Sequence, residues 1–175
     1  MQEKIKTNRL LLTTLFSIVA IAMTVAQVLD LFSDNLSSDN IISLISALST
    51  VVAGLILLGF TCLKKELSLK ELFIPIALYF LCVSISNVNS LYRFNDWTYT
   101  YYLALYGALV LTYFLYVFTG VKCLRYAVYV LMIISMLFAF SGTLGGNSNS
   151  LGRFVLQVVF LGNLYLLDNK EEENV

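Results

Sequence analysis

Six long apolar runs, separated by short polar breaks, constrain this chain more than any other feature of its sequence. A helix needs about 20 mostly apolar residues to cross the hydrocarbon core of a bilayer. We therefore predict an all-α, polytopic integral membrane bundle with six transmembrane helices, at residues 10–31, 41–63, 72–90, 97–121, 124–140 and 151–167. The breaks are too short to hold a soluble domain, so we expect residues 1–175 to form a single transmembrane domain.

The composition favours a bilayer environment as well. Hydrophobic residues make up 59% of the chain, charged residues only 13%, and the mean hydropathy is +0.82, whereas soluble domains average about 25% charged residues. Acidic and basic residues balance at 11 each, so no nucleic-acid partner is indicated. The three cysteines are too few and too scattered for a disulfide framework or a metal site, and no cofactor is implied.

The positions of Lys and Arg predict the orientation of the bundle, because cytoplasmic loops of membrane proteins carry an excess of these residues. Most of them alternate onto one side: Lys4, Lys6, Arg9, Lys64, Lys65, Lys70, Lys122, Arg125 and Lys170. Only Arg93 and Arg153 fall on the other side. We expect both termini in the cytoplasm of a protein that crosses the cell membrane several times.

A cleaved signal peptide is the alternative interpretation of the first run. The basic stretch "KIKTNR", the apolar residues after it and the "TVA" that ends at Ala26 together resemble a signal peptide with a cleavage site. The apolar run continues past Ala26 and is long enough to span, which favours a transmembrane helix.

Small and polar residues mark one side of each of the first two spans, at helical spacing. They are Thr13, Ser17, Ala20, Thr24 and Gln27 in the first, and Ser43, Ala47, Thr50 and Gly54 in the second. Small residues let membrane helices approach closely, so we expect the two seams to meet. The opposite side of the first span carries Ala22 and Ala26, an A-x-x-x-A pair that could seat a further helix or another subunit.

Two tyrosines, Tyr106 and Tyr113, lie near the middle of the fourth span, where a phenol without a hydrogen-bond partner is costly. Tyr79, Gln157 and Gln27 are candidate partners from other spans. The alternative is a bond from each hydroxyl to a carbonyl of a neighbouring helix.

The stretch "NVNSLYRFNDWTYTYY", residues 87–102, gathers polar and aromatic side chains at the outer ends of the third and fourth spans. A polar turn with interfacial aromatic anchors would explain it. A solute pocket beneath the two outer arginines is the functional alternative, because guanidinium groups bind anions bidentately and stack on planar groups. Its predicted ligand-binding residues are Arg93, Arg153, Trp97, Asn87, Asn89, Tyr101 and Tyr102, and its ligand a small anionic or planar solute.

The groups that intramembrane enzymes use are missing from the sequence. It has no histidine, no H-E-x-x-H and no G-x-S-x-G, so we do not expect an enzyme. The acidic residues lie at the ends of the spans, whereas proton-coupled transporters place ionisable groups within them.

In length, in its six spans, in the Ala22 and Ala26 pair and in its polar outer rim, the chain resembles the substrate-capture subunits of energy-coupling-factor vitamin importers. That resemblance implies a pocket that opens outward and a partner module that carries the ATPases. We therefore expect a non-catalytic, solute-binding or transport-associated subunit. A bacteriocin-type immunity protein, or an accessory subunit of a larger membrane complex, is the alternative.

Overall fold

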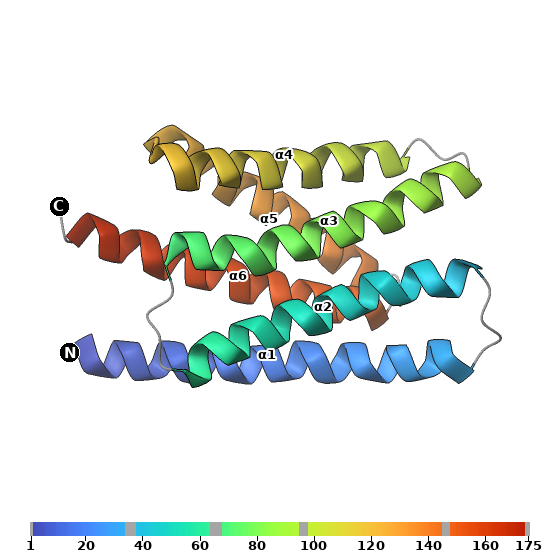
Figure 1. Ribbon diagram of the computed structural model, residues 1–175, viewed down its shortest axis with the longest axis horizontal. Coiled ribbons are helices and arrows are strands. Elements are labelled where there is room, and N and C mark those ends of the chain that lie inside the picture. The colour runs from blue at the N-terminus through green and yellow to red at the C-terminus, as the bar shows by residue number, and fades with distance from the viewer. Residues whose placement is uncertain (1, 34–37, 64–67, 95–97, 145–147, 174–175) are drawn as a thin grey trace.

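The computed structural model is a bundle of six helices that run alternately up and down (Figure 1). It describes residues 2–33, 38–63, 68–94, 98–144 and 148–173. The helices are α1 (Gln2–Ser33), α2 (Ser38–Cys62), α3 (Leu69–Phe94), α4 (Thr98–Thr119), α5 (Lys122–Leu144) and α6 (Ser148–Glu173). One helix occupies each predicted span, which confirms the all-α class.

Four of these helices contain segments long and apolar enough to cross a membrane: Leu69–Val88, Tyr99–Thr119, Lys122–Ser141 and Ser150–Leu167. The apolar segments described in α1 and α2 are shorter, Leu11–Val25 and Ala47–Phe60. Large apolar side chains such as Leu11, Leu81 and Leu137 are more than half exposed. An apolar outer surface of this kind suits hydrocarbon better than water.

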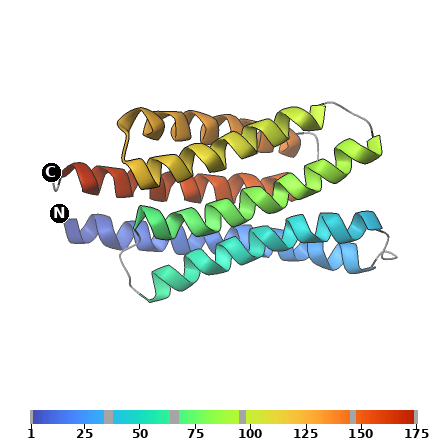
Figure 2. The same cartoon turned by 45° about the horizontal axis from the view of Figure 1, so that its top comes forward.

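Neighbouring helices close into a flattened ring. Each helix packs on the next one along the chain, α6 returns to pack on α1, and α3 and α6 also meet across the middle. Figure 2 shows α3 and α6 between a pair formed by α1 and α2 and a pair formed by α4 and α5. The first turn of α1 and the last turn of α6 lie at the same end.

Local sequence explains where α3 begins and where α4 ends. The Ser68 hydroxyl accepts a hydrogen bond from the Glu71 amide at 3.2 Å, while the Glu71 carboxylate accepts one from the Ser68 amide at 2.8 Å. This reciprocal pair is a capping box, which satisfies the free amides at the start of α3. Gly120 directly follows the end of α4; its positive φ of 66° suits glycine, and its amide donates to the Tyr116 carbonyl at 2.9 Å.

The seam of small residues on α1 contacts two helices rather than α2 alone. A Cβ added at Gly54 of α2 would lie 2.9 Å from Ile21, and one added at Gly152 of α6 would lie 2.9 Å from the Thr24 hydroxyl. Thr13, at the other end of the seam, bonds to Asn163 of α6. The prediction that the α1 and α2 seams meet is therefore incomplete, because the α1 seam also contacts α6. Residues at this spacing cover an arc of α1 that is wide enough for two neighbouring helices.

Four further residues proposed for helix packing or partner contact differ in their surroundings. Ala47 is fully buried inside the bundle. Ala22 is exposed on the outer side of α1. Ala26 and Ser43 lie within α1 and α2, but their side chains fall outside the described part of the structure.

Candidate functional site

A buried carboxamide, Gln157 of α6, connects three helices in the middle of the bundle. Its Nε2 donates a hydrogen bond to the Tyr79 hydroxyl of α3 at 3.1 Å. Its Oε1 accepts one from the Ser135 hydroxyl of α5, also at 3.1 Å. All three side chains are at most 1% exposed, so each bond replaces contacts with water that these groups lose on burial.

Aromatic packing holds the Tyr79 ring in place. Its centroid lies 4.9 Å from that of Phe80 and 5.9 Å from that of Phe160, and both pairs meet edge to face. Such pairs have a preferred geometry. The phenol therefore points toward Gln157 as part of a packed core.

A second phenol and a guanidinium join this group from α4 and α6. Tyr106 is 7% exposed, and its hydroxyl has the Ser135 hydroxyl as a neighbour. Arg153, one turn before Gln157 on the same face of α6, lies near enough to Tyr79 and Tyr106 to interact with both electrostatically. We call Tyr79, Tyr106, Ser135, Arg153 and Gln157 the core polar cluster.

Arg153 occupies the end of this cluster nearest the start of α6. It is half-buried and lies in the second turn of α6, close to the end of the bundle that carries the α3–α4 and α5–α6 connections. The partial positive charge of a helix N-terminus adds to that of the guanidinium. A guanidinium and phenol hydroxyls are groups that can donate hydrogen bonds to an anion.

The predicted outer pocket residues fall into two groups. Tyr102 is half-buried; its ring centroid lies 6.3 Å from that of Tyr106 and 5.2 Å from that of Phe138. It therefore extends the core polar cluster toward the start of α4. Asn87 is half-buried on α3, while Tyr101 is 74% exposed on the surface of α4.

The remaining predicted pocket residues are not fully described. Arg93 and Asn89 belong to the last turns of α3, with side chains outside the described part, and Trp97 lies outside the described residues altogether. A cavity shared by Arg93 and Arg153 stays a prediction.

The sequence suggested two kinds of partner for the buried tyrosines, a polar side chain or a carbonyl of a neighbouring helix, and the structure contains both. The Tyr113 hydroxyl donates to the Leu69 carbonyl of α3 at 3.0 Å, so this phenol bonds a carbonyl of a neighbouring helix. Tyr79 and Gln157, suggested as partners for Tyr106 or Tyr113, bond to each other instead. The side chain of Gln27 lies outside the described part.

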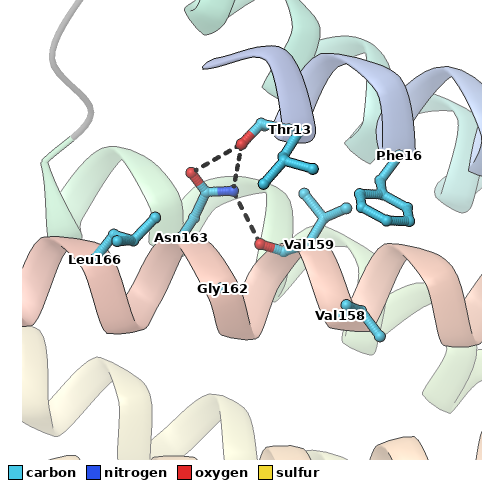
Figure 3. Close-up of a pocket in the computed structure, with 8 residues that line it drawn as sticks. Thr13, Phe16, Val158, Val159, Gly162, Asn163 and Leu166 are labelled. Atoms are coloured by element: carbon cyan, nitrogen blue, oxygen red, sulfur yellow. Dashed lines mark hydrogen bonds between the residues drawn. The ribbon is translucent and has the colours of Figure 1, made fainter. Parts of the chain in front are cut away.

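A groove of about 170 Å³ lies elsewhere, between α1 and α6 (Figure 3). Its lining includes Leu12, Phe16, Val158, Gly162 and Leu166. Thr13 and Asn163, both buried, form a hydrogen-bonded pair that joins the two helices beside it.

Two of these polar residues, Ser135 and Asn163, are not among the side chains that the sequence singles out. Each interrupts a long apolar run, and polar groups at such depth usually have partners inside the protein. That signal marks both positions, but it does not identify Gln157 and Thr13 as the partners. In the described ranges, no three His, Cys, Asp or Glu residues gather as a metal site would require.

No protein-family model, curated protein or solved structure matches this chain.

Proposed function

We propose that the chain is a six-span protein of the cell membrane, with both termini in the cytoplasm, that binds a small anionic or planar solute from the outer side. In this proposal it acts as a solute-binding or transport-associated subunit, and α1 and α2 cross the bilayer with the other four helices. The alternating directions of the six helices and the Lys-rich end of the bundle support this topology.

The observation that carries the proposal is the position of Arg153. Its half-buried guanidinium stands at the outer end of the core polar cluster, within electrostatic reach of two buried phenols. Arg153 lies near the start of the apolar segment Ser150–Leu167, and charged side chains within such segments are rare and generally functional. An anion that enters from outside would meet a guanidinium fork that can bind it bidentately.

A series of aromatic side chains on α4 supports a planar ligand. Tyr99, Tyr102 and Tyr106 follow one another along α4, with ring centroids 6.4 Å and 6.3 Å apart. Tyr106 is the ring of this series that interacts with the Arg153 charge, and the half-buried Tyr99 and Tyr102 continue the series toward the start of α4. A planar acid could stack on a ring and pair with Arg153 at the same time.

Ligand binding to the protein purified in mild detergent tests the proposal. Thermal unfolding against a panel of small carboxylates, phosphates and planar aromatic acids identifies a ligand, and calorimetry then gives its Kd. Replacing Arg153 by Ala removes hydrogen bonds to a charged group, worth about 1.5–3 kcal/mol. We expect the Kd to rise by about 10- to 100-fold. Arg153→Lys keeps the charge but not the guanidinium fork, so its Kd should lie between those of the wild type and Arg153→Ala.

Arg125→Ala is the matched control, because it removes a guanidinium at the opposite end of the bundle, where Arg125 packs on Tyr126. Its Kd should equal that of the wild type. Equal losses in the two alanine variants, or no ligand from the panel, would contradict solute binding at Arg153. A tightly bound second protein in a ligand-free preparation would favour an accessory subunit instead.

A further inference from the structure

The hydroxyl and amide groups of the core polar cluster form a chain of hydrogen bonds that has a direction. The Tyr106 hydroxyl lies beside the Ser135 hydroxyl, and Ser135 donates its only hydroxyl proton to the Gln157 Oε1 at 3.1 Å. Ser135 can therefore meet Tyr106 only as an acceptor. The Gln157 Nε2 in turn donates to the Tyr79 hydroxyl at 3.1 Å. The chain thus leads from α4 through α5 and α6 to Tyr79 of α3.

Tyr79 ends this chain with a proton that no partner accepts. Its hydroxyl accepts from Gln157, and its own O–H has no acceptor among the residues that the structure describes. The Tyr79 side chain is 0% exposed, so bulk water does not reach it. A buried donor of this kind is costly, because it has lost its bonds to water without replacing them.

Reversing the chain gives the Tyr79 proton an acceptor. The oxygen and nitrogen ends of a carboxamide differ little in size, so a half-turn of the Gln157 amide exchanges them without moving the helices. Tyr79 then donates to the Gln157 Oε1, and the Gln157 Nε2 donates to Ser135. The Ser135 hydroxyl, now free to donate, bonds to the Tyr106 oxygen. The number of bonds is unchanged, but the phenol O–H without an acceptor is now that of Tyr106.

Tyr106 is the phenol that an incoming acceptor can reach. It is 7% exposed and interacts with the Arg153 charge. The Tyr79 ring, by contrast, packs against Phe80 and Phe160 in the core. A carboxylate has acceptor oxygens and no donor. It can therefore pair with the guanidinium and accept from the Tyr106 phenol at the same time.

We propose that the solute is a planar carboxylate, one oxygen of which accepts a hydrogen bond from Tyr106. Tyr79 is a positioning residue for this bond. It does not touch the solute, but it sets the direction of the chain, because only the reversed chain gives its own O–H an acceptor. This inference rests on the solute site proposed at Arg153, and it adds the chemical class of the solute and the roles of the two phenols.

Binding of benzoate, a simple planar carboxylate, tests the inference by equilibrium dialysis of the detergent-purified protein with labelled benzoate. We expect Tyr79→Phe to raise the Kd by about tenfold, because the variant loses the preference for the reversed chain that one unsatisfied buried donor provides. Tyr113→Phe is the matched control, since Tyr113 is also 0% exposed but donates to the Leu69 carbonyl. Its Kd should equal that of the wild type.

A double-mutant cycle shows whether Tyr79 acts through Tyr106. Tyr106→Phe alone should weaken benzoate binding. Adding Tyr79→Phe should then change the Kd no further, since the bond that Tyr79 orients is already absent. Losses that multiply in the double variant would mean that Tyr79 affects binding by another route, for example by loosening the core, and would overturn its positioning role.

A spectroscopic measurement on the wild type detects the reversal itself. The chain has three glutamines, Gln2, Gln27 and Gln157, so ¹⁵N-glutamine labelling gives three side-chain amide signals. The signal that is absent from Gln157→Leu belongs to Gln157. We expect saturating benzoate to shift this signal alone, because its Nε2 exchanges a phenol for a serine hydroxyl as partner. An unmoved Gln157 signal in the benzoate complex would overturn the reversal.

The outcomes separate this inference from the function on which it rests. If benzoate does not bind the wild type, or if Arg153→Ala leaves its Kd unchanged, the solute site fails and the inference with it. If Arg153→Ala weakens binding while Tyr79→Phe binds as the wild type does, the solute site stands and the role of Tyr79 alone is wrong.

Discussion

Gln157 illustrates how a single polar residue selects its neighbours in an apolar bundle. A carboxamide has both donors and acceptors to satisfy, and leaving them unpaired away from water costs several kcal/mol. In this structure the Gln157 Nε2 donates to the Tyr79 hydroxyl, and the Gln157 Oε1 accepts from the Ser135 hydroxyl. A rotation of α6 about its axis would break both bonds, so Gln157 fixes which face of α6 points inward.

A double-mutant cycle between Gln157→Leu and Tyr79→Phe measures this bond. Interhelical hydrogen bonds in membrane proteins average about 0.6 kcal/mol and reach about 1.7 kcal/mol. We expect a coupling free energy in that range from reversible unfolding in mixed detergent micelles. Strictly additive effects of the two substitutions would show that the bond contributes nothing to stability.

Helix positions are the part of the fold that the sequence predicts best. The predicted span 124–140 lies inside α5, Lys122–Leu144, and the predicted span 97–121 brackets α4, Thr98–Thr119. The length of each apolar run determines these helix positions, because an apolar run of about 20 residues forms a helix when it crosses the hydrocarbon of a bilayer. Packing partners were less predictable, since a seam such as that of α1 identifies a contact face without specifying how many helices it contacts.

Gly152 should be the most sensitive of the glycines at a helix contact. A Cβ there would come within 2.9 Å of the Thr24 hydroxyl, which donates to the Ala20 carbonyl at 2.8 Å and so is held in place. At Gly59 of α2, an added Cβ would have no neighbour within 4 Å. We expect Gly152→Ala to be less stable than Gly59→Ala by about 1–3 kcal/mol, the usual cost of overpacking. Both variants gain the same helix propensity, so unfolding in micelles reports the clash alone.

Thr24→Ala removes the atom with which the new methyl group collides. Combined with Gly152→Ala, it should recover part of the lost stability. A double variant no more stable than Gly152→Ala would mean that this methyl group does not meet Thr24.

At the scale of the whole molecule, the ring of helices brings polar residues that are far apart in the sequence into two separate buried contacts. Closing α6 onto both α1 and α5 places Asn163 against Thr13 and Gln157 against Ser135. Neither pair is evident from the sequence, because the neighbours of α6 depend on the order of packing rather than on its own composition. Arg153 was singled out from charge alone, since it is one of two basic residues on its side of the bundle.

Both proposals require that the Arg153 end of the bundle face outward and the Lys-rich end face the cytoplasm. Labelling with a membrane-impermeant maleimide tests this directly. One variant keeps only Cys123, an exposed thiol at the start of α5; the other lacks the native cysteines and carries Asn147→Cys, in the break between α5 and α6. We predict that on intact cells the Asn147→Cys variant reacts and Cys123 does not, with the reverse in inside-out vesicles. Labelling of Cys123 on intact cells would contradict the proposed topology.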